Sequence, residues 1–346
     1  MLKDYLSQAV AGQNLSREEA RAAMQVIMSG QANETQIGAF LTALRMKGET
    51  SEEVTGFAET MRSQALKLEC RSKKLIDTCG TGGDQRGTFN ISTAVAFVLA
   101  GAGLSVAKHG NRGVSSSCGS ADVLSALGVK LELSPEAVSE AINTIGVGFI
   151  FAPRFHQAMK YAVNPRKELG FRTVFNLLGP LTNPAGASCQ LIGVYAPDLT
   201  TKVAQALVGL GVTSAMVVHS LDGLDEISTA SPTQVAEVRS GEIRSYVINP
   251  ETYGFGSCTL ADYLGGTVED NARIIERLLA GEQGFKRDIV LLNAAAALVV
   301  ADAAADIHEG LQLAATSIDS GAAFAKLKAL KEFTQGYQDK EELPLS

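Results

Sequence analysis

Apolar residues follow two different spacings along the chain, and the change falls near residue 70. In the first part, apolar residues such as Ala20, Ala23, Met24 and Ile27 recur every three or four positions, which places them on one face of a helix. Segments 16–19 and 50–53 are capping boxes, with Ser or Thr first and Glu last, and 33–36 resembles a third. The pattern predicts that this part is entirely helical.

From Lys74 onward, strand-like apolar runs alternate with helical stretches. We expect strands at 75–76, 104–107, 129–133, 148–151, 191–195 and 215–219, a hairpin from 233–238 and 244–248, and a long alanine-rich helix at 289–305. Such alternation is typical of a mainly parallel sheet covered by helices. The predicted fold class is therefore α/β: a large domain with that sheet, plus a small all-helical domain.

Composition narrows the range of functions. The chain has 346 residues, of which 46% are hydrophobic and 19% charged, as expected for a compact enzyme with a sizeable core. A net charge of −7 argues against general nucleic-acid binding, which needs a basic face. Five cysteines without a Cys-x-x-Cys pair indicate neither a zinc site nor a disulfide framework. Because no run resembles a signal peptide or a membrane-spanning helix, we expect a cytoplasmic protein without a membrane partner.

The segment 77–84 reads Asp-Thr-Cys-Gly-Thr-Gly-Gly-Asp and connects an apolar strand to a helix that starts near Asn90. Glycines let the backbone turn sharply and bring N–H groups close to a ligand, and the start of a helix attracts anions. Asn90, Ser92 and Thr93 add side-chain donors. The segment is compatible with a phosphate pocket; taken alone, the glycine cluster would be better interpreted as a tight turn.

Its glycine spacing differs from both familiar nucleotide-binding motifs. No Lys follows the glycines, as a P-loop requires. The dinucleotide fingerprint needs Gly-x-Gly-x-x-Gly, whereas Gly80 and Gly82 are followed by Asp84 and Gln85. The sequence therefore indicates a different kind of phosphate site.

A second donor-rich segment, 108–117, reads Lys-His-Gly-Asn-Arg-Gly-Val-Ser-Ser-Ser and also follows a predicted strand. Lys108 and Arg112 supply positive charge, and the glycines and serines supply further donors for an anion. Loops at the carboxyl ends of parallel strands gather at one edge of the sheet, where ligands bind. Two such loops together favour a binding site over an accidental turn.

Adjacent carboxylates, Asp225 and Glu226, follow the strand predicted at 215–219. The pair could be an ordinary acidic turn. At a strand end that faces phosphate loops, it is better interpreted as a ligand pair for Mg²⁺, which is usually held by one or two carboxylates and substrate phosphates. Ser92 is a candidate third ligand through its hydroxyl.

Together these motifs resemble the anthranilate phosphoribosyltransferase family of tryptophan biosynthesis. The matching stretches span essentially the whole chain and are 80–84, 90–93, 108–112, 164–170, 175–184 and 225–226. The resemblance implies transfer of the 5-phosphoribosyl group from 5-phosphoribosyl 1-pyrophosphate (PRPP) to the amino group of anthranilate. Pyrophosphate is released and N-(5-phosphoribosyl)anthranilate is formed, with Mg²⁺ as cofactor. It also implies a homodimer.

The resemblance further implies a discontinuous helical domain, 1–70 with 164–184, and a large α/β domain, 71–163 with 185–346, with the active site in the cleft between them. Arg166 is placed in that cleft, where its guanidinium would hold the carboxylate of the aromatic substrate. His109 and His156 fall in the same region and are either substrate contacts or structural residues.

The resulting site assignment has three parts. The expected metal ligands are Ser92, Asp225 and Glu226. The expected anthranilate-binding residues are Gly80, Asn111 and Arg166, with His109, Pro153 and His156 as further candidates. The expected PRPP-binding residues are Gly80, Thr81, Gly82, Gly83, Asp84, Thr88, Asn90, Ile91, Ser92, Thr93, Lys108, His109, Gly110, Asn111, Arg112, Gly113, Val114, Ser115, Ser116 and Ser120.

No general acid, general base or nucleophile is assigned, because an arylamine can lose its proton after it attacks. Two other functions remain open at this point. One is a pyrimidine nucleoside phosphorylase, which shares the glycine loop more loosely. The other is a non-catalytic, nucleic-acid-binding relative, which an acidic chain with intact phosphate loops does not favour.

Overall fold

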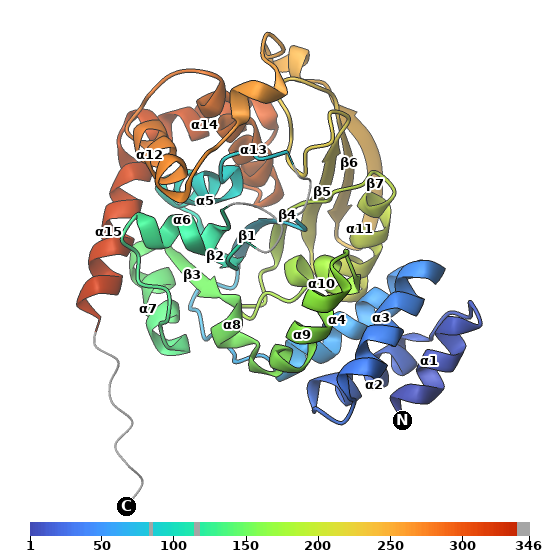
Figure 1. The fold of residues 1–346 in the computed structure, drawn as a ribbon. Helices are drawn as coiled ribbons and strands as arrows, with labels where there is room; N and C mark the ends of the chain where they lie inside the picture. The colour runs from blue at the N-terminus through green and yellow to red at the C-terminus, as the bar shows by residue number, and fades with distance from the viewer. Residues whose placement is uncertain (83–85, 114–117, 338–346) are drawn as a thin grey trace, which may run out of the picture.

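The computed structural model of the chain describes residues 1–82, 86–113 and 118–337 (Figure 1). Four N-terminal helices precede a seven-stranded sheet that carries helices on both faces. This arrangement confirms the predicted α/β fold class with an all-helical N-terminal part.

Three of the four N-terminal helices begin where the capping boxes predict. The four helices are α1 (Leu2–Val10), α2 (Arg17–Met28), α3 (Glu34–Lys47) and α4 (Ser51–Gln64). Ser16, Asn33 and Thr50 cap α2, α3 and α4, and each accepts a hydrogen bond from the backbone three residues later. These bonds satisfy N–H groups that a helix start leaves unpaired.

The sheet has the strand order β3-β2-β1-β4-β5-β6-β7. β1 to β5 are parallel, whereas β6 and β7 run antiparallel as a hairpin. The chain winds from β1 outward to β3 and then returns to the other side of β1, so the order reverses between β1 and β4. The strands are β1 (Leu75–Gly80), β2 (Ser105–Gly110), β3 (Val147–Phe151), β4 (Cys189–Gly193), β5 (Ser214–Ser220), β6 (Thr233–Arg239) and β7 (Glu242–Ile248).

Two apolar layers sandwich the sheet. Along β5, Met216 and Val218 join the core formed with α5 and α13, while Ala215 and Val217 join the core formed with α11 and the N-terminal helices. The remaining helices are α5 (Ile91–Gly101), α6 (Ser120–Ala126), α7 (Pro135–Ile145), α8 (Ala152–Phe155), α9 (Lys160–Leu169), α10 (Val174–Leu181), α11 (Leu199–Gly209), α12 (Val268–Leu279), α13 (Phe285–Val300), α14 (Ile307–Asp319) and α15 (Ala322–Gly336).

The strand predicted at 129–133 is wrong. Val129, Leu131 and Leu133 are buried in alternation, which explains the strand-like pattern. However, the N–H of Lys130 donates to Oγ1 of Thr334 in α15 (3.1 Å) and not to a neighbouring strand. The segment is an extended connection between α6 and α7. The other predicted strands overlap observed ones.

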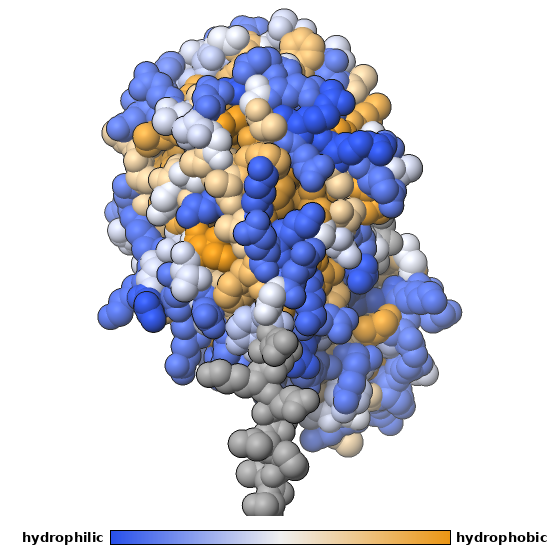
Figure 2. All heavy atoms as spheres, turned by 90° about the vertical axis from the view of Figure 1, so that its left-hand side faces the viewer, coloured by the Kyte–Doolittle hydropathy of each residue, from blue (hydrophilic) through white to orange (hydrophobic). Residues whose placement is uncertain are grey.

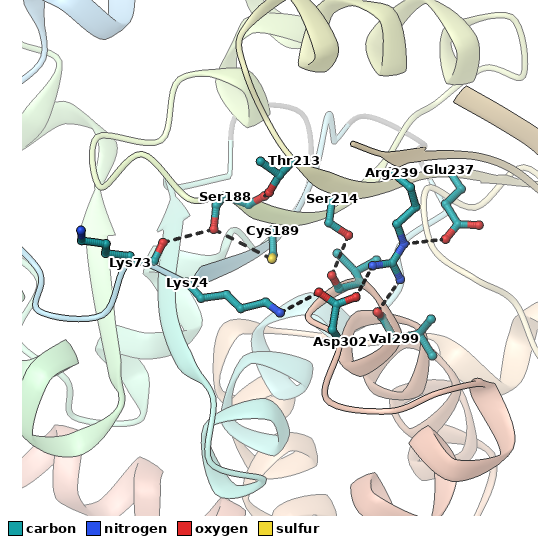
Figure 3. Close-up of polar contacts among 11 residues, drawn as sticks. Lys73, Lys74, Ser188, Cys189, Thr213, Ser214, Glu237, Arg239, Val299 and Asp302 are labelled. Atoms are coloured by element: carbon teal, nitrogen blue, oxygen red, sulfur yellow. Dashed lines mark hydrogen bonds and ion pairs between the residues drawn. The ribbon is translucent and has the colours of Figure 1, made fainter. Parts of the chain in front are cut away.

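The helix predicted at 289–305 corresponds to α13, which ends at Val300 and not at residue 305. Asp302 then adopts a positive φ of 49° and turns its carboxylate toward the amino ends of the strands. There it binds Nζ of Lys74 (2.7 Å) and Nη1 of Arg239 (2.5 Å), as Figure 3 shows. Arg239 also donates to the carbonyl of Val299 (2.6 Å), so Asp302 and Val299 connect the end of α13 to this edge of the sheet.

Residues 164–184 leave the sheet, as predicted, and form most of α9 and α10. α9 packs against α2 and α3, and α10 packs against α3 and α4. Pro165 lies within α9 and Pro180 within α10. The excursion therefore lies beside the N-terminal helices, although α9 already begins at Lys160.

The face on the α15 side is mainly hydrophilic, with smaller hydrophobic areas between the polar residues (Figure 2). Within the described part of the chain, no helix combines the length and apolar character that a membrane crossing requires.

Glu53 is the buried polar centre of the N-terminal helices, with 0% of its side chain exposed. It accepts hydrogen bonds from the N–H groups of Leu15 and Thr50 and pairs with the buried Lys47 (each 2.8 Å). Glu53→Ala should lower the free energy of unfolding by about 3–5 kcal/mol, because Lys47 loses its buried partner. Urea denaturation measures this, with the exposed Glu52→Ala as control. Equal stability of the two variants would contradict the assigned role.

Candidate active site

The candidate site lies at the carboxyl ends of β1 and β4, where the strand order reverses. This point is the usual ligand crevice of an open parallel sheet. Asp225, in the loop after β5, packs directly over both strand ends. A Cβ at Gly80 would lie 2.5 Å from Oδ2 of Asp225, and one at Gly193 would overlap the Asp225 carbonyl. The glycines therefore leave the space that the carboxylate loop occupies.

The glycine loop starts from this contact. The N–H of Thr81 donates to the carbonyl of Gly193 (2.9 Å), and Oγ1 of Thr81 accepts from the N–H of Tyr195 (3.2 Å). Gly82 has φ +63° and donates its N–H to Oδ2 of Asp225 (3.1 Å). A Cβ added at Gly82 would meet nothing within 4 Å, so the positive φ, and not steric exclusion, requires glycine there. Gly83 and Asp84 lie outside the described residues.

The far half of this loop is tied to the segment that precedes α12. Thr88 forms a β-bridge with Leu264, and the N–H of Phe89 donates to the carbonyl of Tyr263 (3.0 Å). The Tyr263 hydroxyl in turn shares a 2.7 Å hydrogen bond with Oγ1 of Thr229, just beyond the carboxylate pair. Sequence reasoning missed Tyr263, because nothing in its local pattern points to the two loops that it joins.

The start of α5 supports the pocket in more than one way. Asn90 caps the helix, but its amide donates to the carbonyl of Cys118 (3.1 Å) and so connects the two donor-rich loops. Ile91 and Thr93 are buried. Of the three predicted donors Asn90, Ser92 and Thr93, Ser92 contacts a charged residue within the described part of the chain: its Oγ accepts from Nζ of Lys108 (3.3 Å).

Lys108 is a buried cation between the loops. It projects from β2 and is 3% exposed, and its Nζ also donates to the carbonyl of Thr78 (2.6 Å). Burial lowers the pKa of Lys108, and the charges of Asp77 and Glu226 oppose this shift. An anion that enters the pocket therefore meets an ammonium group that is poorly solvated.

Asp122 organises the second loop, and sequence reasoning missed this role of Asp122. Its Oδ2 accepts from the N–H groups of Gly113 (2.8 Å) and Gly119 (3.0 Å), and its Oδ1 binds Arg112 (3.0 Å). Burial opposes ionisation of Asp122, but these donors outweigh it and lower the pKa of the carboxyl. Arg112, predicted to supply positive charge to the site, forms an ion pair with Asp122.

The remaining predicted residues of this loop are placed as follows. Gly110 is the last residue of β2, where a Cβ would meet the ring of Phe149 at 2.8 Å. Asn111 follows it, and its carbonyl accepts from Oγ of Ser120 at the start of α6 (3.4 Å). Val114, Ser115 and Ser116 lie outside the described residues.

On the opposite face of β2, His109 meets His156, with ring centroids 5.2 Å apart. Burial lowers the pKa of His109 to about 3 and that of His156 to about 4, so both rings are neutral near pH 7. Among the described residues, neither Nε2 atom has a hydrogen-bond partner, although both are buried. Pro153, the third candidate here, lies nearby in the chain, in α8.

Arg166 lies on α9, above the ring of Phe175 in α10 (5.2 Å to the centroid). Burial lowers the pKa of Arg166. Within the described residues, its guanidinium makes no hydrogen bond or ion pair. The backbone of Gly179 contacts His109. Gly179 is four residues after Phe175, so these two residues of α10 lie on the same face of the helix. Arg166 and the histidines thus border the same helix face.

A buried polar pair supports the site from below. Asp77 accepts from the N–H of His109 (3.2 Å) and from Nδ2 of Asn183 (2.7 Å), which also donates to the carbonyl of Ala107 (2.8 Å). Burial raises the pKa of Asp77. The two residues fix the spacing of β1 and β2 beneath the loops. Both lie in or beside the motifs that the sequence points to, but their roles depend on tertiary contacts.

The donor set at the carboxylate loop fits a hard cation. No group of three or more His, Cys, Asp or Glu side chains forms a metal site among the described residues. Asp225 and Glu226 offer two carboxylates, and the Glu226 charge acts on Lys108, which contacts Ser92. Mg²⁺ commonly takes its other ligands from water and substrate phosphates, so a two-carboxylate site suits it.

Comparison with known proteins agrees with this geometry. The helical bundle domain of the glycosyl transferase family matches residues 3–65, and its a/b domain matches residues 72–324. The anthranilate phosphoribosyltransferase of Moorella thermoacetica is 56% identical over 337 residues, which are 97% of this chain and 99% of that protein. That of Pelotomaculum thermopropionicum is 54% identical over 334 residues, 96% and 97% of the two chains. The chain belongs to the anthranilate phosphoribosyltransferase family.

Solved structures of the family superimpose on the whole chain. The enzyme from Thermus thermophilus has a TM-score of 0.91 at 42% identity, over 96% of this chain and 99% of that one. The Saccharomyces cerevisiae enzyme in complex with PRPP and Mg has a TM-score of 0.89 at 28% identity, over 97% and 98%. These relatives confirm the family and the activity predicted from the sequence. They support neither the nucleoside phosphorylase nor the nucleic-acid-binding alternative.

The conformation of Gly82 gives a prediction that separates folding from binding. Gly82→Ala should lower the free energy of unfolding by about 1–2 kcal/mol, because alanine is strained at positive φ. Because Gly82 also bonds Asp225, we expect the variant to lose most of the rise in Tm that PRPP and Mg²⁺ cause. Gly211→Ala is the matched control, with φ +76° and open space around it but at the far end of α11. An undiminished ligand-induced shift in Gly82→Ala would return the loop to an ordinary turn.

Proposed function

We propose that this chain transfers the 5-phosphoribosyl group from PRPP to the amino group of anthranilate at the crevice between β1 and β4. One observation carries the proposal: a buried lysine, a glycine loop and two adjacent carboxylates converge on the point where the strand order reverses. A polyanionic substrate carried with a divalent cation suits this combination of charges.

The phosphate and pyrophosphate groups would bind along the two loops. The start of α5 directs its N–H groups and positive dipole end toward this pocket. Lys108 would exchange the carbonyl of Thr78 and the hydroxyl of Ser92 for phosphate oxygens. That exchange replaces two neutral acceptors with an anion. The ammonium group forms stronger hydrogen bonds to an anion than to neutral oxygens.

Asp225 and Glu226, with Ser92 as a third candidate, would hold Mg²⁺. Bound there, the cation would neutralise negative charge on the departing pyrophosphate. The fit rests on hard oxygen donors and on the space that Gly80 and Gly193 leave for the carboxylate loop. The yeast enzyme crystallised with PRPP and Mg supports the same cofactor.

Anthranilate would bind between Arg166 and the His109–His156 pair. The Arg166 guanidinium is desolvated and has no hydrogen bond or ion pair among the described residues, so it can receive a carboxylate. The two neutral imidazoles have unpaired Nε2 atoms that can contact an aromatic amine or acid. The yeast enzyme also crystallised with 4-fluoroanthranilate, at a TM-score of 0.87 and 26% identity.

In this arrangement the chain acts mainly by positioning. The arylamine would be held in line with the bond to pyrophosphate, which converts a bimolecular encounter into an oriented reaction. Lys108 would stabilise the leaving group throughout. No residue is assigned to remove the amine proton, because the proton becomes acidic once the nitrogen has attacked.

Three further features stay predictions. The domain division, 1–70 with 164–184 against 71–163 with 185–346, with the active site in the cleft between them, agrees with the packing of α9 and α10 on α2 to α4. A homodimer agrees with the exposure of Val10 in α1 and Met46 in α3, which are 72% and 83% exposed. A cytoplasmic location is expected because no run in the sequence resembles a signal peptide or a membrane-spanning helix.

The metal assignment predicts that activity requires Mg²⁺ and that the double variant Asp225→Ala, Glu226→Ala loses most of it. The reason is that both proposed carboxylate ligands disappear. Loss of anthranilate fluorescence in the presence of PRPP measures turnover, and thermal unfolding without ligand checks the fold. Near-normal turnover of the double variant at limiting Mg²⁺ would exclude these residues as metal ligands.

The two substrate subsites predict separate kinetic effects. Arg166→Ala should lower kcat/KM for anthranilate about a hundredfold, equivalent to roughly 2–3 kcal/mol, because a charged hydrogen-bond partner is lost. Lys108→Ala should act instead on the PRPP dependence. The neighbouring exposed Lys167→Ala controls for changes in α9. An Arg166→Ala variant that altered only the PRPP dependence would show that the aromatic site lies elsewhere.

A further inference from the structure

Asn293 makes a two-point contact with the backbone beside the carboxylate pair. This asparagine of α13 is 0% exposed. Its Oδ1 accepts the N–H of Ile227 (2.9 Å) and its Nδ2 donates to the carbonyl of Ile227 (2.8 Å). The N–H of Ile227 belongs to the peptide bond of Glu226. The amide therefore fixes the peptide units on both sides of Ile227.

The amide of Asn293 is itself held in orientation. Its Nδ2 donates a second hydrogen bond to the carbonyl of Ile289, one turn earlier in α13 (2.8 Å). α13 packs against β4, β5, α5 and α14, and most of its residues are buried. An anchor on such a helix is far stiffer than the loop that it holds.

The loop from Asp222 to Thr229 has other anchors. Oδ2 of Asp225 accepts from the N–H of Gly82, and further hydrogen bonds hold the flanks of the loop. Oγ of Ser228 donates to Oδ2 of Asp222 (2.7 Å), and the N–H of Ser228 donates to Oγ1 of Thr233 (3.2 Å). These bonds close the loop on itself and onto β6. The contact with Asn293 instead connects the backbone at Glu226 to the helical layer on the α5 side of the sheet.

We propose that Asn293 is a positioning residue that sets the Glu226 carboxylate for the divalent cation, through the backbone of Ile227. This inference deepens the proposed function and rests on Asp225 and Glu226 as metal ligands. Asn293 is fully buried and its amide is bonded to backbone groups, so it would act through Ile227 and not by contact with substrate or metal. Loss of its amide frees the peptide units beside Glu226, so the carboxylate no longer holds one orientation before the cation binds.

The test compares Asn293→Ala with Thr334→Val in the full-length protein. Thr334 is also buried and also accepts a backbone N–H from a connecting segment, but in α15, away from the site. Binding of Mn²⁺ in the presence of PRPP, followed by electron paramagnetic resonance, is the readout that needs no turnover. Steady-state KM values for PRPP at limiting Mg²⁺ and for anthranilate give a second readout, and Tm reports stability.

We expect Asn293→Ala to weaken Mn²⁺ binding about tenfold or more, as removal of outer partners of metal ligands usually does. KM for PRPP should rise at limiting Mg²⁺, and KM for anthranilate should stay within about twofold. Thr334→Val should lower Tm with Mn²⁺ binding unchanged. Asn293→Asp is the second variant, for use if the alanine variant does not fold. It keeps the size of the side chain and its acceptor but loses the amide donor, so it should also weaken Mn²⁺ binding.

Glu226→Gln separates this inference from the proposed function. If Glu226→Gln weakens Mn²⁺ binding but neither Asn293 variant does, Asn293 is only structural and the inference is overturned. If Glu226→Gln leaves Mn²⁺ binding intact, the metal assignment and the inference that rests on it both fail.

Discussion

The site depends on one steric constraint: Asp225 occupies space that side chains at residues 80 and 193 would fill. Its carboxylate lies at Gly80 and its backbone lies at Gly193. Gly80 and Gly193 end the two strands at which the sheet order reverses. With no Cβ on either strand end, Asp225 can lie on the sheet edge and accept the N–H of Gly82. The metal candidate and the phosphate loop are therefore held by the same contact.

The second feature on which the site depends is the partnering of its positively charged side chains, which differs from one to the next. Lys108 is satisfied by a carbonyl and a hydroxyl, Asp122 holds Arg112, and Arg166 has only the ring of Phe175 beside it among the described contacts. Desolvation strengthens the attraction of such cations for an anion that enters. Arg112 is paired with Asp122 within its loop, whereas in the proposed function Lys108 and Arg166 receive charged groups of the substrates.

Much of this could be predicted from sequence, because its signals are local. Capping boxes mark the starts of α2, α3 and α4, and the glycine and lysine motifs mark the ends of β1 and β2. The prediction at 129–133 failed because three buried apolar residues alternate with the exposed Lys130 and Glu132, which is the same pattern as that of a half-buried strand. Asp77, Asp122 and Asn293 were not predicted as site residues, because each acts through a backbone group brought close only by folding.

The missed residues Asp122, Asn293 and Tyr263 share one physical role: each holds a backbone group of a loop from outside that loop. A loop that must meet phosphate or metal exposes its own backbone donors to the ligand, so it cannot use all of them to hold itself together. Asp122 from α6, Asn293 from α13 and Tyr263 beside α12 supply the missing hydrogen bonds from behind the loops. The loop residues then determine which ligand binds. The anchors determine how much the loop must still be ordered when the ligand binds. Less ordering of the loop on binding favours affinity.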